Sequence, residues 1–228
     1  EILRCLVGSE MCIRDRMCMM TYPNAAAGLK TVYQARLVGL ISIVLVIVPI
    51  VQIFAIAAIL VAAFLSLVGL AQCRKDDKGY RTAFNLVIIG LVTNLAASLV
   101  SAYAGTEGIA GICGNILSMA DDILSLASLY FVCITTNRLL KETAAAENLI
   151  DRGIVVWKLN VVCTVILLVC YLLRMIHGNI AVIIAGYLAI FAVIAQIIGT
   201  VLYILYLRNA YRALEAAVPP EEEVQQMM

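Results

Sequence analysis

The sequence predicts an all-α, polytopic membrane protein with six transmembrane helices arranged as three hairpins, and three observations support this. Hydrophobic residues make up 64% of the 228 residues and charged residues only 14%, with a mean hydropathy of +1.01, which is not the composition of a soluble domain. Long uncharged stretches recur along the chain, and almost all basic residues fall on one side of the predicted membrane. A net charge of +1 and 7% aromatic residues give no basis for nucleic-acid binding.

Residues 1–16 are expected to be foreign to the protein. The segment CLVGSEMCIRDR at 5–16 resembles a translated transposase adapter of the kind used in sequencing libraries. A signal peptide would instead need an apolar stretch of about 7 to 15 residues and a small-residue cleavage site at the right distance. We therefore expect a native start at Met17, Met19 or Met20, and a cytoplasmic N-terminal segment that extends to residue 30.

The spans follow from the uncharged stretches. The run from Leu37 to Gln72 has 36 residues and as one helix would measure about 54 Å, against a hydrocarbon core of about 30 Å. It must therefore fold back near Pro49 and Gln52, where proline interrupts the helical ladder. The acidic segment 218–228 is expected to be a disordered tail. The membrane domain is predicted over 31–217, with spans near 31–48, 53–72, 82–103, 118–140, 153–176 and 178–207.

The basic residues predict the orientation. Only Arg174 falls on the outer side of the six-span arrangement, so the positive-inside rule places both termini in the cytoplasm. Aromatic residues near the inner boundary, among them Tyr80, Tyr203 and Tyr206, are interpreted as an interfacial belt. The basic residues on the inner side are Lys30, Arg36, Arg74, Lys75, Lys78, Arg81, Arg138, Lys141, Arg152, Lys158, Arg208 and Arg212.

Several short segments resemble a group of small, uncharacterised six-span membrane proteins of low-GC Gram-positive bacteria. The segments are GLK at 28–30, KDDKGYRTAF at 75–84, VWKLN at 156–160 and YRALE at 211–215. The resemblance covers most of 21–217 and implies six helices in a bacterial plasma membrane. It implies no activity, substrate or catalytic residue.

Two amides are predicted to lie at mid-membrane, where polar residues are the first candidates for function. Asn94 lies within a stripe of small residues, Gly90, Ala97 and Ser101, that would let another helix approach closely. Gln196 is expected at a similar height in the last span. The amides either line a substrate path or form interhelical hydrogen bonds, and the second interpretation is favoured, with Asn94 and Gln196 as mutual partners.

Asp121 and Asp122 are the sharpest candidates for a functional site, and their depth depends on where the fourth helix begins. A start at Ser118, with its hydroxyl as the helix cap, places both aspartates in the first turn at the outer rim. A start near Ala110 would bury them in the membrane, where carboxylates usually mark an ion or proton pathway. The first alternative is preferred, because the apolar segment from Ile123 to Leu140 is long enough to span only with these first-turn residues at the outer rim. The glycines at 105, 108, 111 and 114 are expected to lie in a loop before this helix.

Arg174 is predicted to pair with Asp121 or Asp122 across the outer ends of the fourth and fifth helices, because a base among apolar helices requires an anion nearby. The candidate polar or ion site therefore comprises Asp121, Asp122, Asn94, Gln196 and Arg174. Asp122 is also expected to face the interior of the bundle on one helical face with Ser125 and Leu129.

No enzyme is predicted. The native cysteines lack the C-x-x-C spacing of metal or redox sites, and His177 has no partner at a catalytic spacing. No cofactor or metal is expected, and the expected partners are the lipid bilayer and a second copy or another membrane protein. Two functions remain open: a structural or regulatory membrane protein, which is favoured, and a small transporter or channel lined by polar faces of the third, fourth and sixth helices. The depth of Asp121 discriminates between them.

Overall fold

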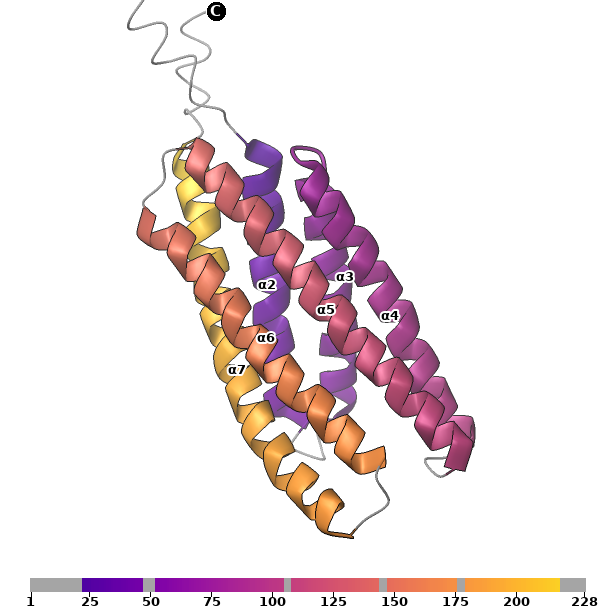
Figure 1. Cartoon of the computed structure of the whole chain (residues 1–228). Helices are drawn as coiled ribbons and strands as arrows, with labels where there is room; N and C mark the ends of the chain where they lie inside the picture. Colours follow the sequence, from indigo (N-terminus) through magenta and orange to yellow (C-terminus); the bar gives the residue numbers. More distant parts are fainter. Residues whose placement is uncertain (1–21, 47–51, 105–107, 144–146, 176–178, 218–228) are drawn as a thin grey trace, which may run out of the picture.

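The computed structural model describes residues 22–46, 52–104, 108–143, 147–175 and 179–217, and these form a bundle of helices without strands (Figure 1). Our predictions for residues 1–21, for the acidic tail, for Pro49 and for His177 lie outside the described residues. In chain order the helices are α2 (Pro23–Val46), α3 (Gln52–Cys73), α4 (Lys78–Ala104), α5 (Gly108–Glu142), α6 (Glu147–Met175) and α7 (Asn179–Ala216).

Five of these helices, α3 to α7, are long and apolar enough to cross a membrane. Helix α2 is not among them over its described residues. Sequential helices pack as three antiparallel hairpins, α2 with α3, α4 with α5, and α6 with α7. The predicted hairpin arrangement is therefore present in the structure.

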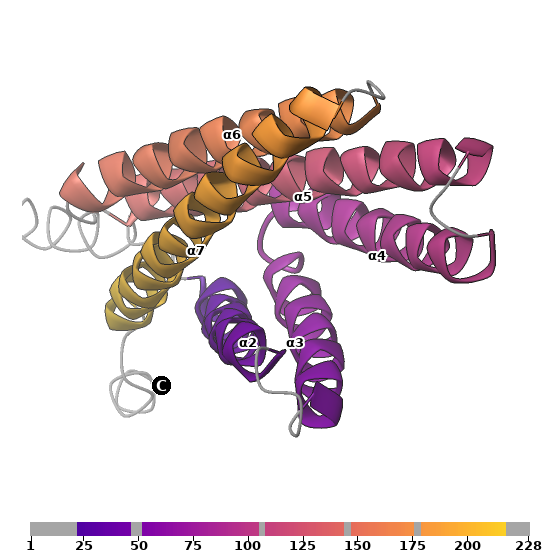
Figure 2. The same cartoon turned by 90° about the horizontal axis from the view of Figure 1, so that it is seen from below.

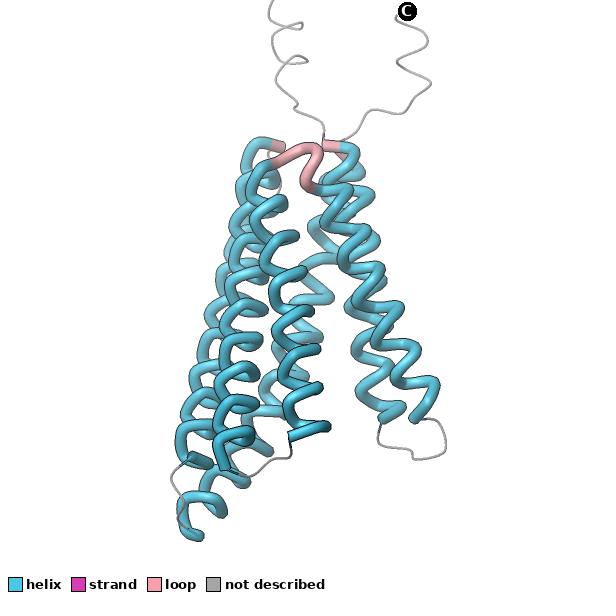
Figure 3. Tube along the Cα trace, turned by 90° about the vertical axis from the view of Figure 1, so that its right-hand side faces the viewer, coloured by secondary structure: helices cyan, strands magenta, loops and turns pink. Residues whose placement is uncertain are grey.

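The bundle is packed at one end and spread apart at the other (Figure 3). At the packed end lie the start of α2, the α3–α4 turn, the end of α5, the start of α6 and the end of α7; we call this the closed end. Figure 2, viewed along the bundle, shows the α2–α3 hairpin diverging from the other two. We call the remaining part, which contains the ends of α2, α4 and α6 and the starts of α3, α5 and α7, the open half.

Buried tyrosines organise the closed end. Tyr80, Tyr203 and Tyr206 are 0%, 3% and 2% exposed, so their rings lie inside the bundle and not on its lipid-facing surface. Their height near the inner membrane boundary stays a prediction. The packed helices give the hydroxyl groups of Tyr80 and Tyr206 partners within the core. The Tyr80 hydroxyl lies 2.8 Å from Thr136 Oγ1, and the Tyr206 hydroxyl donates to Asn137 Oδ1 at 2.8 Å.

Two aspartates of the α3–α4 turn cap helices at the closed end. Asp76 accepts hydrogen bonds from the backbone N–H of Ala25, at 2.7 Å, and from the side chain of Asn24, so the turn after α3 caps the start of α2. Asp77 accepts from the backbone N–H of Gly79 and thereby caps α4, and it also forms an ion pair with Arg138 of α5. These caps explain why α2 and α4 begin eight and four residues earlier than the apolar pattern predicts.

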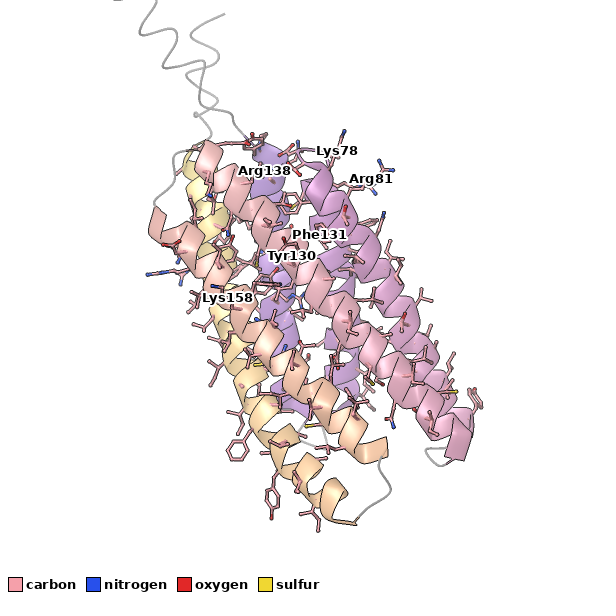
Figure 4. All side chains as sticks on the ribbon, viewed as in Figure 1. Lys78, Arg81, Tyr130, Phe131, Arg138 and Lys158 are labelled. Carbon is pink, nitrogen blue, oxygen red and sulfur yellow. The ribbon has the colours of Figure 1, made fainter. Side chains whose placement is uncertain are left out.

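Glycines allow the helices of the closed end to touch. A Cβ atom at Gly28 of α2 would lie 2.5 Å from the backbone oxygen of Gly69 of α3, and one at Gly79 would lie 2.1 Å from Thr135 Oγ1. Real Cβ atoms do not approach other atoms so closely, so only glycine fits at these contacts. Figure 4 shows Arg138 and Lys78 at this end, whereas Tyr130 and Phe131 lie nearer the middle of α5.

Candidate functional site

Two cavities meet in the middle of the bundle. The larger, about 320 Å³, lies among α2, α3, α4 and α5 and reaches Tyr203 of α7. The smaller, about 160 Å³, lies among α2, α5, α6 and α7. Arg36, Ser125, Leu129 and Tyr203 line both, so the two spaces adjoin. Their polar lining is formed by Arg36, Ser66, Asn94, Asp121, Asp122, Ser125, Ser128, Asn160, Thr164, Gln196, Thr200 and Tyr203.

Asp121 lies in the interior of a helix, not at its first turn. Helix α5 begins at Gly108, so Asp121 is thirteen residues beyond its start and twenty-one before its end at Glu142. These separations correspond to about 20 Å and about 32 Å along the helix axis. The prediction that the fourth helix begins at Ser118 is therefore wrong, and the two aspartates are not first-turn residues. Their depth in the membrane stays a prediction.

The cause of this error is the glycine-rich segment before Ser118. Gly111 and Gly114 lie inside α5, although glycine lowers helix propensity by about 1 kcal/mol relative to alanine. Gly114 packs against α4, where a Cβ atom would lie 3.4 Å from Ser101 Oγ, an ordinary van der Waals distance. The Ser118 hydroxyl donates to the backbone oxygen of Gly114 at 3.0 Å within the helix, so it is not a cap.

Asn94 and Asp121 join α4 to α5 at mid-height. Asn94 Nδ2 donates to Asp121 Oδ2 at 2.9 Å. Gly90, one turn away on α4, makes room for this carboxylate, because a Cβ atom there would lie 3.2 Å from Asp121 Oδ1. The predicted stripe of small residues thus faces α5, as expected for a close helix–helix contact. The predicted Asn94–Gln196 pair is wrong, because Asn94 bonds an acid on a neighbouring helix.

Gln196 of α7 is joined to α6 instead. Its Nε2 donates to Asn160 Oδ1 at 3.3 Å, and Asn160 Nδ2 donates to the backbone oxygen of Val156 at 2.8 Å. The other polar atom of the side chain, Gln196 Oε1, is buried without a hydrogen-bond partner among the described residues. A buried acceptor without a partner costs about 1–3 kcal/mol, so this oxygen is suited to accept a hydrogen bond from a bound molecule.

Asp122 faces the smaller cavity. Ser125 and Leu129, three and seven residues further along α5, line the same space, which confirms that this helical face points into the bundle. Tyr171 of α6 interacts with the Asp122 carboxyl group. Asp122 Oδ2 is buried and, within the described part of the chain, accepts no hydrogen bond.

Arg36 is the site residue that sequence reasoning missed. Its guanidinium group lies over the Tyr203 ring, 5.6 Å from the ring centroid, and it lines both cavities. In the sequence it was one of several inner anchors. The available signal was its helical face, which it shares with the buried Val32 and with Gly39, so this base interrupts an otherwise apolar stripe.

Arg174 is not brought into this site by any described contact. It lies one residue before the end of α6, and its side chain is outside the described residues. Its predicted pairing with Asp121 or Asp122 therefore stays a prediction. The described ion pairs, Lys30 with Glu215 and Arg138 with Asp77, both belong to the closed end.

The site combines one base, two acids and several hydroxyl and amide groups around a cavity between the hairpins. Such a lining can replace the hydration of a small polar solute. Within the described residues, no group of three His, Cys, Asp or Glu side chains is placed to hold a metal ion.

Comparisons of this chain with protein-family models, with curated proteins and with solved structures found no significant match.

Proposed function

We propose that this protein is a multi-pass membrane protein whose central cavities bind a small polar solute and carry it across the bilayer. The observation that supports this most strongly is the mid-helix position of Asp121 and Asp122 beside cavities that Arg36 also lines. Ionisable residues at mid-membrane are costly and are usually found where an ion or solute passes. This position favours the transport hypothesis over the structural role that the sequence alone favoured.

The proposed orientation places the closed end in the cytoplasm of a bacterium, with all six helices in the plasma membrane. Its support is the charge distribution, because the turns and helix ends that carry most basic residues meet at the closed end. In this orientation the cavities are reached from the outside and sealed from the inside by the tyrosine-rich core. A complete transport cycle would require the closed end to open in turn.

A proteoliposome assay tests transport directly. Vesicles with and without the protein are mixed with hyperosmotic glycerol, urea, amino acids or sugars, and solute entry is followed by light scattering as the vesicles reswell. We expect at least one solute to enter several-fold faster with the protein, and Asp122→Leu or Arg36→Leu to remove that gain. Asp151→Asn, at an exposed position outside both cavities, is the matched control. Equal rates in vesicles with and without the protein for every solute would refute transport.

A structural or regulatory role is the second candidate. It is favoured by the large apolar side chains exposed on the open half, such as Phe64 and Phe191, at 66% and 70% exposure. Such faces contact either lipid or the helices of a partner. A protein with this role would give no solute flux in the assay and would form a stable complex in mild detergent.

A further inference from the structure

The smaller cavity contains two opposite charges that do not neutralise each other by direct contact. Arg36 from α2 and Asp122 from α5 both line it. No ion pair joins Arg36 to a carboxylate in the described part of the chain, and Tyr203 offers it only an aromatic face. The Arg36 side chain is exposed to the space between the helices, so water or a ligand with the opposite charge can solvate it there. The lining therefore offers binding sites for an anionic and a cationic group within one space.

The unpaired acceptors of the cavity favour a particular cation. Asp122 Oδ2 and Gln196 Oε1 are both buried without hydrogen-bond partners among the described residues, and both side chains line the cavity. The hydroxyl groups of Thr164 and Thr200 lie on the same walls, although the Thr200 hydroxyl donates to the backbone of its own helix. An ammonium group has three hydrogens to donate and no acceptor, so it fits a wall of oxygen atoms.

The Arg36 guanidinium group fits a carboxylate. A guanidinium group presents a planar fork of donors that matches the two oxygens of a carboxylate. The Arg36 guanidinium lies over the Tyr203 ring, and no described residue accepts a hydrogen bond from it, so its N–H groups can bind a ligand. A volume of about 160 Å³ restricts the solute to a small molecule, since pockets for drug-sized ligands usually measure about 300–1,000 Å³.

We propose that the solute is a small zwitterion, with its carboxylate on Arg36 and its ammonium group on Asp122 and Gln196. This inference rests on the proposed function and specifies its substrate class. A molecule with both charges neutralises both walls at once, whereas a simple anion or cation leaves one wall uncompensated.

A matched set of four-carbon compounds tests this proposal. The full chain is purified in detergent, and its unfolding temperature is measured with 2-aminobutyrate, 4-aminobutyrate, butyrate or butylamine. The two aminobutyrates carry both charges at different spacings, and the other two carry one charge each. We expect at least one aminobutyrate to raise the unfolding temperature while butyrate and butylamine at the same concentration do not. Equal stabilisation by butyrate or butylamine would overturn the proposal, as would stabilisation by none of the four.

Single substitutions test which residues bind the aminobutyrate. Arg36→Gln and Asp122→Asn are each expected to weaken aminobutyrate binding by about tenfold or more. Lys158→Gln, an exposed position on α6 that lines neither cavity, should leave it unchanged. Arg36→Lys keeps the charge and provides a folded variant if Arg36→Gln does not fold. Unchanged binding in both charge-removing variants would overturn the assignment. Glycerol flux without aminobutyrate binding would disprove the zwitterion but leave the proposed function standing.

Discussion

The closed end and the open half are built from the same apolar helices but are held together in different ways. At the closed end the backbones of α2 and α3 touch through Gly28 and Gly69, and large side chains such as Tyr80 and Leu207 are fully buried. In the open half a Cβ atom at Gly186 would meet no atom within 4 Å. Hydrophobicity alone therefore does not make the helices converge. Convergence requires close backbone contacts and polar groups with partners.

The glycine contacts give the largest predicted difference between the two regions. We expect Gly28→Ala to destabilise the protein by about 3 kcal/mol or more, because the new methyl group would overlap a backbone oxygen that cannot move aside. Gly186→Ala is the matched control and should be neutral or stabilising by up to about 1 kcal/mol, because alanine favours a helix and nothing obstructs it. Unfolding in detergent measures both, and equal losses would show that the open half is also closely packed.

The cap on α2 gives the next largest effect. Asp76→Ala removes the acceptor for the backbone N–H of Ala25 and for Asn24, and should destabilise the protein by about 1–2 kcal/mol. Asp151→Ala removes an exposed carboxylate near the start of α6 and serves as the control. If the two variants lose the same stability, capping does not hold the α2–α3 hairpin at the closed end.

The polar contact between α4 and α5 tests how the middle of the bundle is held. Asn94→Leu and Asp121→Leu should each lower the free energy of unfolding by about 1 kcal/mol. The double variant should lose less than the sum of the two, because the single losses share the 2.9 Å hydrogen bond. Strictly additive losses in the double-mutant cycle would show that this bond does not form in the folded protein.

The smallest predicted effect is the pH dependence of stability that a tyrosine at the closed end contributes. The hydrogen bond from Tyr22 to Glu142 raises the pKa of the phenol from 10.0 to about 12. A raised pKa means that this contribution to stability is complete below pH 10 and is lost as the pH rises toward 12. We expect the free energy of unfolding to fall with rising pH between pH 10 and about 12, and we expect Tyr22→Phe to remove this fall. A slope that survives in Tyr22→Phe would assign the pH dependence to another group.

The sequence predicted the helices better than the contacts between them. Uncharged stretches place a helix wherever a membrane must be crossed, and the predicted spans overlap α2 to α7. The bounds differ where side chains from elsewhere decide them, as Asp76 does for α2. The start of α5 was missed because glycine is a loop signal in water, but between packed helices it allows close contact.

The candidate site was predicted in part. The sequence identified Asp121, Asp122, Asn94 and Gln196 from the cost of polar groups in a membrane, and all four line the cavities. It assigned the wrong partners to Asn94 and Gln196, because equal height on two helices does not tell which helices are neighbours. It missed Arg36 because a base six residues after Lys30 resembles a second interfacial anchor.

A labelling test of the orientation needs a residue other than Cys73, although Cys73 adjoins the basic loop. It is fully buried beneath α2, so it would stay unlabelled from either side. A cysteine introduced at Lys78, which is exposed at the closed end in Figure 4, reports the side of the membrane instead.

The most direct test of the account is the accessibility of the cavity from the two sides of the membrane. Ser125→Cys and Thr136→Cys are compared in a background in which the exposed Cys113 is replaced by serine. The first position lines both cavities, and the second is fully buried at the closed end. A membrane-impermeant thiol reagent added outside intact cells should label Ser125→Cys and leave Thr136→Cys unmodified. Protection of Ser125→Cys from both sides, or equal labelling of the two positions, would contradict a bundle that is open at one end and closed at the other.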